Sequence, residues 1–235
     1  MQILSTTIYN KPMTKAIIAD IANLSNLDFD DIYKILTPER KSKIDDFVFE
    51  WDKKLSALSE LCLYYLISTE FKYNGNLIEK GWSSNKKPYL KNIPNLRYSV
   101  SHSGNKCIVG ISNQYEIGLD IEFVSRYNDI DMQKYIRNII SEKELPFAEC
   151  GTSDLQRALV IWTKKEALFK SVGNGSLTQF LKRKLSYEEV KSVKSFLIDD
   201  YIVSIASVAE NIKIIDAEDI GLRNIINQIK AWMHI

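Results

Sequence analysis

The most constraining feature of this 235-residue sequence is a strictly alternating segment at its middle, Ile117-Gly118-Leu119-Asp120-Ile121-Glu122-Phe123. Side chains alternate between the two faces of a β-strand, so the large apolar residues share one face, and Asp120 and Glu122 share the other. One face therefore belongs to a core. Two like charges this close repel each other unless a cation or solvent lies between them. The segment predicts a half-buried strand with either a cation site or a solvent-facing acidic edge.

A second constraint comes from residues 154–171, whose apolar residues recur at three- and four-residue steps and predict a helix. Glu166 falls inside this apolar stripe, and Lys170 lies four residues beyond it. One interpretation is an ordinary Glu–Lys pair at the margin of the stripe, worth about 0.2–0.5 kcal/mol. That pair does not explain the inward placement, because a carboxylate on an apolar face is costly unless it is paired or liganded. Three carboxylates without imidazole suit a hard cation such as Mg²⁺.

The order of predicted elements indicates an α+β protein of two similar halves in tandem, joined near Gly118. We expect an N-terminal lobe over residues 1–117 and a C-terminal lobe over residues 118–235. The predicted strands are Ile3–Tyr9, Asn95–His102, Cys107–Ile111, Ile117–Phe123, Phe196–Asp199 and Tyr201–Ser207, with a hairpin turn at 113–115 and another at 199–200. One helix is predicted to start after Thr37, and a second, amphipathic helix is predicted to end near Phe71. Further helices are predicted over 131–140, 154–171 and 219–233, and residues 75–88 are predicted to be rich in turns.

Composition excludes several classes of protein. The 31 Lys and Arg residues nearly balance the 30 Asp and Glu, which argues against bulk binding to nucleic acid or an anionic membrane. Three scattered cysteines and two histidines argue against a disulfide framework and against imidazole-based metal sites. No leader opens the chain, and the apolar stretch at 61–67 is too short to span a bilayer. We expect a cytoplasmic protein without membrane or nucleic-acid partners.

Phosphate recognition in so neutral a chain must be local, and three segments can supply it. Arg40 and Lys43 share one helical face, Lys87-Pro88 follows a second lysine, and Ser101-His102-Ser103-Gly104 ends a predicted strand. Serine hydroxyls, an imidazole and turn amides can all donate to an oxyanion. Gly173-Asn174-Gly175 follows a helix and lacks the Gly-Lys-Ser/Thr of a phosphate loop, so we interpret it as a helix C-cap.

Three blocks in this order resemble the 4′-phosphopantetheinyl transferases of the two-lobed, surfactin-synthetase-activating type. They are residues 99–104, 117–122 and 162–175, the last of which fits the family pattern W-[ST]-x-K-E-A-x-x-K-x-x-G-x-G at every defined position. Weaker similarity extends from 36 to about 190. The family's R-x-L-x-G block is replaced here by Leu55-Ser56-Ala57-Leu58-Ser59, which lacks the arginine, and Lys53 or Lys54 is a candidate to compensate.

The resemblance implies two pseudo-symmetric α+β lobes with the active site in the cleft between them. It implies coenzyme A as the substrate, Mg²⁺ on its pyrophosphate, transfer of the 4′-phosphopantetheine arm to a serine of an apo acyl or peptidyl carrier protein, and release of 3′,5′-ADP. It further implies Asp120, Glu122 and Glu166 as metal ligands, Lys170 as the catalytic lysine on the pyrophosphate, and coenzyme contacts at Arg40, Lys43, Ser56, Lys87, Pro88, Ser101, His102 and Lys170.

Glu144 matches the family's proposed catalytic base, although an exposed helix glutamate beside Glu142 and Lys143 is an equal interpretation. Two rival functions share part of this pattern. One is a Mg²⁺-dependent hydrolase of nucleotide pyrophosphates, and the other is a non-catalytic module that binds coenzyme A or a carrier. A chain with both lobes is expected to act as a monomer, because the cleft is then complete within one molecule.

Overall fold

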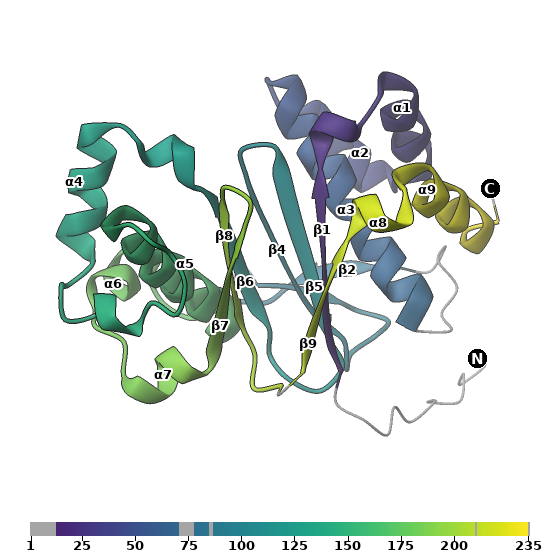
Figure 1. Cartoon of the computed structure of the whole chain (residues 1–235). Coiled ribbons are helices and arrows are strands. Elements are labelled where there is room, and N and C mark those ends of the chain that lie inside the picture. Colours follow the sequence, from purple (N-terminus) through teal and green to yellow (C-terminus); the bar gives the residue numbers. More distant parts are fainter. Residues whose placement is uncertain (1–12, 71–77, 85–86, 210, 235) are drawn as a thin grey trace.

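In the computed structural model, residues 13–70, 78–84, 87–209 and 211–234 are described. Two sheets face each other at the centre, and helices cover the outer face of each (Figure 1). The predicted α+β class is confirmed. The predicted strand Ile3–Tyr9 lies outside the described residues.

The first sheet has the strand order β4-β5-β1-β9 and is covered by a long buried helix, α3 (Glu50–Glu70). Its strands are β1 (Thr14–Asp20), β4 (Arg97–Ser103), β5 (Lys106–Ser112) and β9 (Ile212–Asp216). Helices α1 (Asn26–Ile35) and α2 (Pro38–Asp45) pack against α3. Thr37 caps α2 by accepting a hydrogen bond from the Arg40 amide at 3.3 Å, as its position before Pro38 predicts.

The second sheet has the strand order β6-β8-β7 and is covered by α5 (Asp154–Val172). Its strands are β6 (Gly118–Phe123), β7 (Val193–Ile198) and β8 (Tyr201–Ala206). Smaller helices surround α5, namely α4 (Ile130–Ile139), α6 (Leu177–Lys182) and α7 (Tyr187–Lys191). The helix α5 ends where predicted, because Gly173 takes a left-handed φ of 64° and its amide bonds the Phe169 carbonyl at 2.8 Å.

The hairpin predicted at residues 113–115 is wrong, although both of its strands exist. Strand β5 pairs with β1 on one side and β4 on the other, so neither of its edges is free for β6. Strand β6 instead pairs with β8 in the facing sheet. The sheets approach closely here, since a Cβ on Gly110 would lie 2.6 Å from Cδ2 of Leu119.

The predicted turn-rich stretch also contains a two-stranded sheet of β2 (Lys80–Trp82) and β3 (Pro88–Leu90).

The expected boundary between residues 117 and 118 does not divide the chain into its lobes. Strand β9 pairs in parallel with β1, α8 (Ala217–Ile220) packs against β1, and α9 (Leu222–Trp232) lies beside α1 and α3 (Figure 1). Buried Ile225, Ile226 and Ile229 join the core around α3. The end of the chain thus belongs to the first lobe, because the apolar face of α9 is buried there and not against α5.

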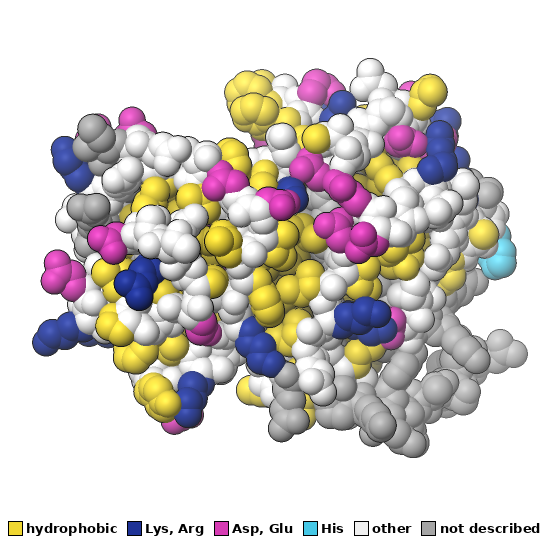
Figure 2. All heavy atoms as spheres, in the orientation of Figure 1, with side chains coloured by type: hydrophobic (Ala, Val, Ile, Leu, Met, Phe, Trp, Pro, Cys, Tyr) yellow, Lys and Arg dark blue, Asp and Glu magenta, His cyan; other side chains and the backbone are white. Residues whose placement is uncertain are grey.

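Charged side chains are distributed unevenly on the surface. Figure 2 shows acidic side chains gathered near the ends of β1 and α8, while lysine and arginine side chains are scattered over the same face. Among these groups, Lys106 donates to Asp199 at 2.8 Å. Within the described residues, no helix has the length and apolar content needed to cross a membrane.

Candidate active site

Of the two carboxylates of β6, Asp120 is buried and Glu122 is half-buried. Leu119 and Ile121 point into the core between the sheets, as the alternation predicts, and the opposite face packs against α5. A Cβ on Gly118 would lie 2.0 Å from the Ala167 carbonyl oxygen, so only glycine allows this close approach of strand and helix. Asp120 is 2% exposed. The solvent-facing edge, one of the two interpretations of the segment, is therefore wrong for Asp120.

Helix α5 brings a third carboxylate and a lysine to the same place. The Lys170 ammonium donates to Oδ1 of Asp120 at 2.7 Å and lies 3.8 Å from Oε2 of Glu166. Burial, followed by the negative charge of Asp120, raises the pKa of Glu166 to about 8. Burial and the same charge also raise the pKa of Glu122. The three carboxylates therefore influence one another electrostatically, while their joint role as metal ligands stays a prediction.

The donor chemistry of this cluster fits a hard divalent cation. Oδ2 of Asp120 is buried and has no hydrogen-bond partner, which is costly for a carboxylate oxygen in a closed site. Carboxylate repulsion of the kind that raises the pKa of Glu166 is relieved by a bound cation. Among the described residues, no three His, Cys, Asp or Glu side chains form a ready-made metal centre. Lys170 instead supplies the positive charge beside Asp120.

A pocket of about 800 Å³ adjoins this cluster, and Lys170 belongs to both. Its walls come from α2, α3, β2, β3 and β4 on one side and from the end of α5 on the other. The predicted coenzyme contacts that line it are Arg40, Lys43, Ser56, Lys87, Pro88, His102 and Lys170. Six lysine or arginine side chains face three glutamates among the described lining residues, so the positive excess is local in a nearly neutral chain.

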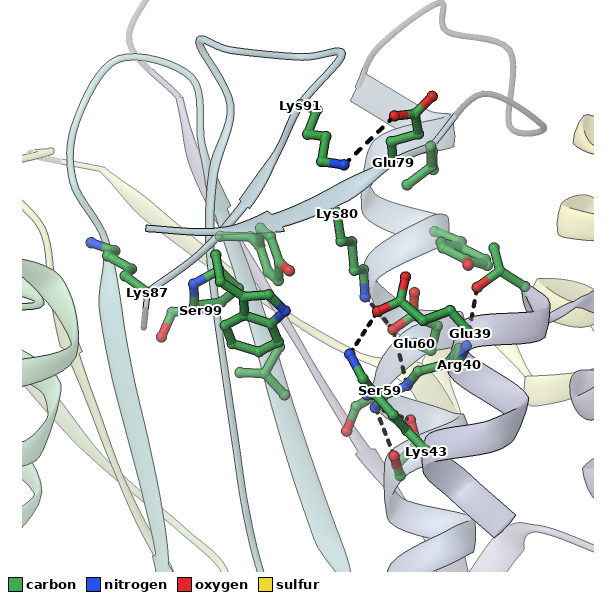
Figure 3. Close-up of a pocket in the computed structure, with 18 of the residues that line it drawn as sticks. Glu39, Arg40, Lys43, Ser59, Glu60, Glu79, Lys80, Lys87, Lys91 and Ser99 are labelled. Carbon is green, nitrogen blue, oxygen red and sulfur yellow. Dashed lines mark hydrogen bonds and ion pairs between the residues drawn. The ribbon is translucent and has the colours of Figure 1, made fainter. Parts of the chain in front are cut away.

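The wall of the pocket formed by α2 and α3 carries a charged network that the sequence analysis missed. Figure 3 shows Lys80 and Arg40 both directed at the buried carboxylate of Glu60. Arg40 Nη2 also donates to Oγ of Ser56 at 2.7 Å, and the buried Nε of Arg40 has no hydrogen-bond partner. Glu60 is the available sequence signal, because a charge in an otherwise apolar stretch of a long helix needs a partner.

The predicted compensation by Lys53 or Lys54 for the missing arginine is wrong. Lys53 pairs with Glu50 at 3.2 Å, Lys54 donates to Asn26 at 3.3 Å, and neither lines the pocket. Arg40 of α2 instead donates a hydrogen bond to the Ser56 hydroxyl of α3.

Two further predicted contacts have protein partners. Lys87 donates to Glu116 and to the Ser171 carbonyl at 2.5 Å each, so it ties the pocket wall to the end of α5. Ser101 donates to Asp120 at 2.7 Å and accepts from Lys170 at 2.9 Å, which places its hydroxyl in the carboxylate cluster and not among the pocket-lining groups. Desolvation lowers the pKa of His102 and so favours the neutral form of its imidazole.

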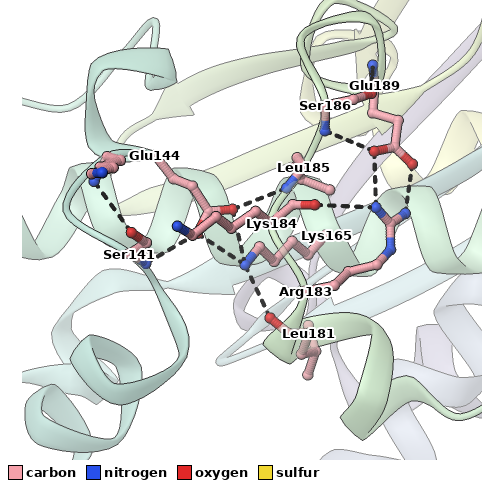
Figure 4. Close-up of polar contacts among 10 residues, drawn as sticks. Ser141, Glu144, Lys165, Leu181, Arg183, Lys184, Leu185, Ser186 and Glu189 are labelled. Atoms are coloured by element: carbon pink, nitrogen blue, oxygen red, sulfur yellow. Dashed lines mark hydrogen bonds and ion pairs between the residues drawn. The ribbon is translucent and has the colours of Figure 1, made fainter.

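Glu144 lies apart from the pocket lining and is buried, with 3% of its surface exposed. Figure 4 shows its carboxylate among Lys165, Ser141 and Leu185. Lys165 Nζ lies 3.1 Å from its Oε1, and the amides of Ser141 and Leu185 donate at 3.0 and 3.2 Å. The interpretation of Glu144 as an exposed helix residue is wrong. Its role as a base stays a prediction, which these contacts disfavour because they occupy both oxygens.

Comparison with protein families gives two adjacent matches. A family model described as "4′-phosphopantetheinyl transferase, N-terminal" matches residues 23–114. A second, described as "4′-phosphopantetheinyl transferase superfamily", matches residues 116–207. The first match covers most of the first lobe, and the second contains β6, α5 and the carboxylate cluster.

Curated relatives are similar over about 60–65% of the chain. The L-aminoadipate-semialdehyde dehydrogenase-phosphopantetheinyl transferase of Pongo abelii is 24% identical over 152 residues, which are 60% of this chain and 49% of the relative. The 4′-phosphopantetheinyl transferase Sfp of Bacillus subtilis (strain 168) is 23% identical over 154 residues, 65% of this chain and 66% of the relative. The alignments thus span about half the length of the mammalian relative and about two thirds of the bacterial one.

Proposed function

The chain belongs to the 4′-phosphopantetheinyl transferase superfamily, and from this membership and the site geometry we propose that it moves the 4′-phosphopantetheine arm of coenzyme A onto a carrier-protein serine. The product released is 3′,5′-ADP. The observation that carries the proposal is the junction at Lys170, where a cation-lined pocket meets three converging carboxylates.

The nucleotide end of coenzyme A is assigned to the cation-lined pocket. Arg40, Lys43 and His102 offer donors to phosphate oxygens, and the pocket volume of about 800 Å³ is within the range of sites for small ligands and cofactors. Arg40 is held by Ser56 and Glu60, so its guanidinium is oriented before the ligand arrives. Pre-orientation of this kind lowers the entropy cost of binding.

Asp120, Glu122 and Glu166 are proposed to hold Mg²⁺, as the unpartnered Oδ2 of Asp120 supports. When bound, Mg²⁺ neutralises the charge of the pyrophosphate and stabilises the leaving phosphate oxygen. Lys170 is proposed to act in the chemical step, because its ammonium can move from Asp120 to the phosphate oxygens on which negative charge develops. An ammonium aimed at developing charge in a partly buried site lowers the barrier of the chemical step.

The acceptor is proposed to be the serine hydroxyl of an apo acyl or peptidyl carrier protein. The pocket walls come from both lobes of one chain, so a monomer has every residue the reaction needs. Proton removal from the serine requires a base near the carboxylate cluster, and Glu166 belongs to this cluster whereas Glu144 lies apart from it.

The test is incubation with coenzyme A, Mg²⁺ and an apo carrier domain, followed by intact-mass analysis of the carrier. We expect the carrier to gain one phosphopantetheine and 3′,5′-ADP to appear in equal amount. Asp120→Asn is the matched control, since it keeps the side-chain shape and removes the charge. Nucleotide cleavage without a mass gain indicates the hydrolase, and coenzyme binding without cleavage indicates the non-catalytic module. Either result contradicts the proposal.

A further inference from the structure

Strands β4 and β6 are edge strands of two different sheets and lie side by side across the lobe boundary. Ser99, Ser101 and Ser103 occur at every second position of β4 and are 6%, 8% and 3% exposed. Because alternate residues of a strand share a face, these three side chains point to the same side. Each of them hydrogen-bonds a group of β6.

The outer two serines satisfy backbone amides of the β6 edge. Oγ of Ser99 accepts from the Leu119 amide at 3.2 Å, and Oγ of Ser103 accepts from the Phe123 amide at 3.1 Å. An edge strand presents unpaired amides, and a buried amide without an acceptor is destabilising. Side-chain hydroxyls therefore join two sheets that share no backbone ladder.

Ser103 differs from Ser99 in having a second bond. Its hydroxyl donates to Oε2 of Glu122 at 2.7 Å while it accepts from Phe123. A serine hydroxyl has a single proton, so its donor capacity is fully committed to this carboxylate. The bond fixes a glutamate side chain that otherwise has three rotatable bonds.

From this geometry we infer that Ser103 is a positioning residue for Glu122, which it holds in the conformation that serves the metal without itself touching coenzyme or metal. The inference rests on the proposed metal site. Hydrogen-bonded partners of metal ligands contribute about 10–100-fold to metal affinity. Tyr127 also hydrogen-bonds Glu122, so we expect the loss of Ser103 to fall at the low end of this range.

The first experiment compares Ser103→Ala with Ser99→Ala in calorimetric titrations of the full chain with Mg²⁺ alone. Both variants lose a hydroxyl that bonds a β6 amide, so both are expected to melt at a lower temperature than the wild type. We expect only Ser103→Ala to weaken Mg²⁺ binding, by about tenfold. Unchanged Mg²⁺ affinity in Ser103→Ala, or equal weakening in Ser99→Ala, overturns the inference.

A second pair keeps the test decisive if Ser103→Ala does not fold. Ser103→Thr and Ser103→Val have nearly the same volume and differ in the hydroxyl. The threonine variant is expected to bind Mg²⁺ more tightly than the valine variant, and equal affinities overturn the inference. A wild-type protein that takes up no Mg²⁺ contradicts the proposed metal site as well. A wild type that binds Mg²⁺ beside an unaffected Ser103→Ala contradicts the positioning role alone.

Discussion

Replacing Glu144 by glutamine separates a structural from a catalytic role for this residue. Glutamine keeps the length of the side chain but removes its negative charge, and its amide nitrogen turns toward donors that need an acceptor. Lys165, which is fully buried, then has no counter-charge, although its bond to the Leu181 carbonyl at 3.0 Å survives. We therefore expect Glu144→Gln to destabilise the fold.

The magnitude follows from the burial of both partners. Breaking a buried ion pair by removing one member costs about 3–5 kcal/mol, because the other charge stays desolvated. In a chain of this length, each kcal/mol shifts the melting temperature by about 2–4 °C, so a decrease of roughly 6–20 °C is expected. The double variant Glu144→Gln with Lys165→Met is expected to recover at least half of the loss, since no unpaired charge remains.

The assay is scanning calorimetry and urea unfolding of the wild type and both variants, with the transfer rate expressed per folded molecule. If Glu144 is instead a general base, the opposite result is expected for Glu144→Gln: the transfer rate falls by roughly 10²–10⁴-fold and the stability of the fold is unchanged. A Glu144→Gln variant that unfolds like the wild type, or a double variant less stable than the single one, refutes the reasoning.

Three other predictions address the site and its surroundings. Asp120→Ala is expected to abolish Mg²⁺-dependent transfer measured per folded molecule, and activity near the wild-type level excludes the metal site. Lys170→Ala should lower kcat far more than it weakens coenzyme binding measured by calorimetry, and a change confined to KM contradicts a role in the transition state. Arg183 lowers the pKa of Glu189 from 4.5 to about 2, so this carboxylate stabilises the fold above pH 4.5 and loses that effect as the pH falls toward 2. Glu189→Gln should therefore cost about 1 kcal/mol at pH 7, after allowance for solvent screening, and progressively less as the pH falls from 4.5 toward 2, as melts across this range can verify.

Features that depend on neighbouring residues along the chain were predictable from the sequence. Thr37 before Pro38 marks the start of α2, Gly173 ends α5, and the alternation around Asp120 defines β6 and its core face. These signals are local, because a cap or a strand face depends on backbone geometry within a few residues. The carboxylates and lysines of the site could be selected for the same reason, by their spacing within one element.

Pairing partners and burial were decided only by the tertiary structure. No local signal shows that β6 pairs with β8 instead of β5, or that β9 returns to the first lobe beside β1. The strand edges that pair come from distant parts of the chain, and which of them pair depends on which apolar faces can be buried together. The same holds for Glu144, which follows the polar run Ser141-Glu142-Lys143 and whose carboxylate contacts Lys165 and Leu185, residues far along the chain. An amino-acid sequence states which groups are charged, but the packing of distant segments determines which of these charges solvent can reach.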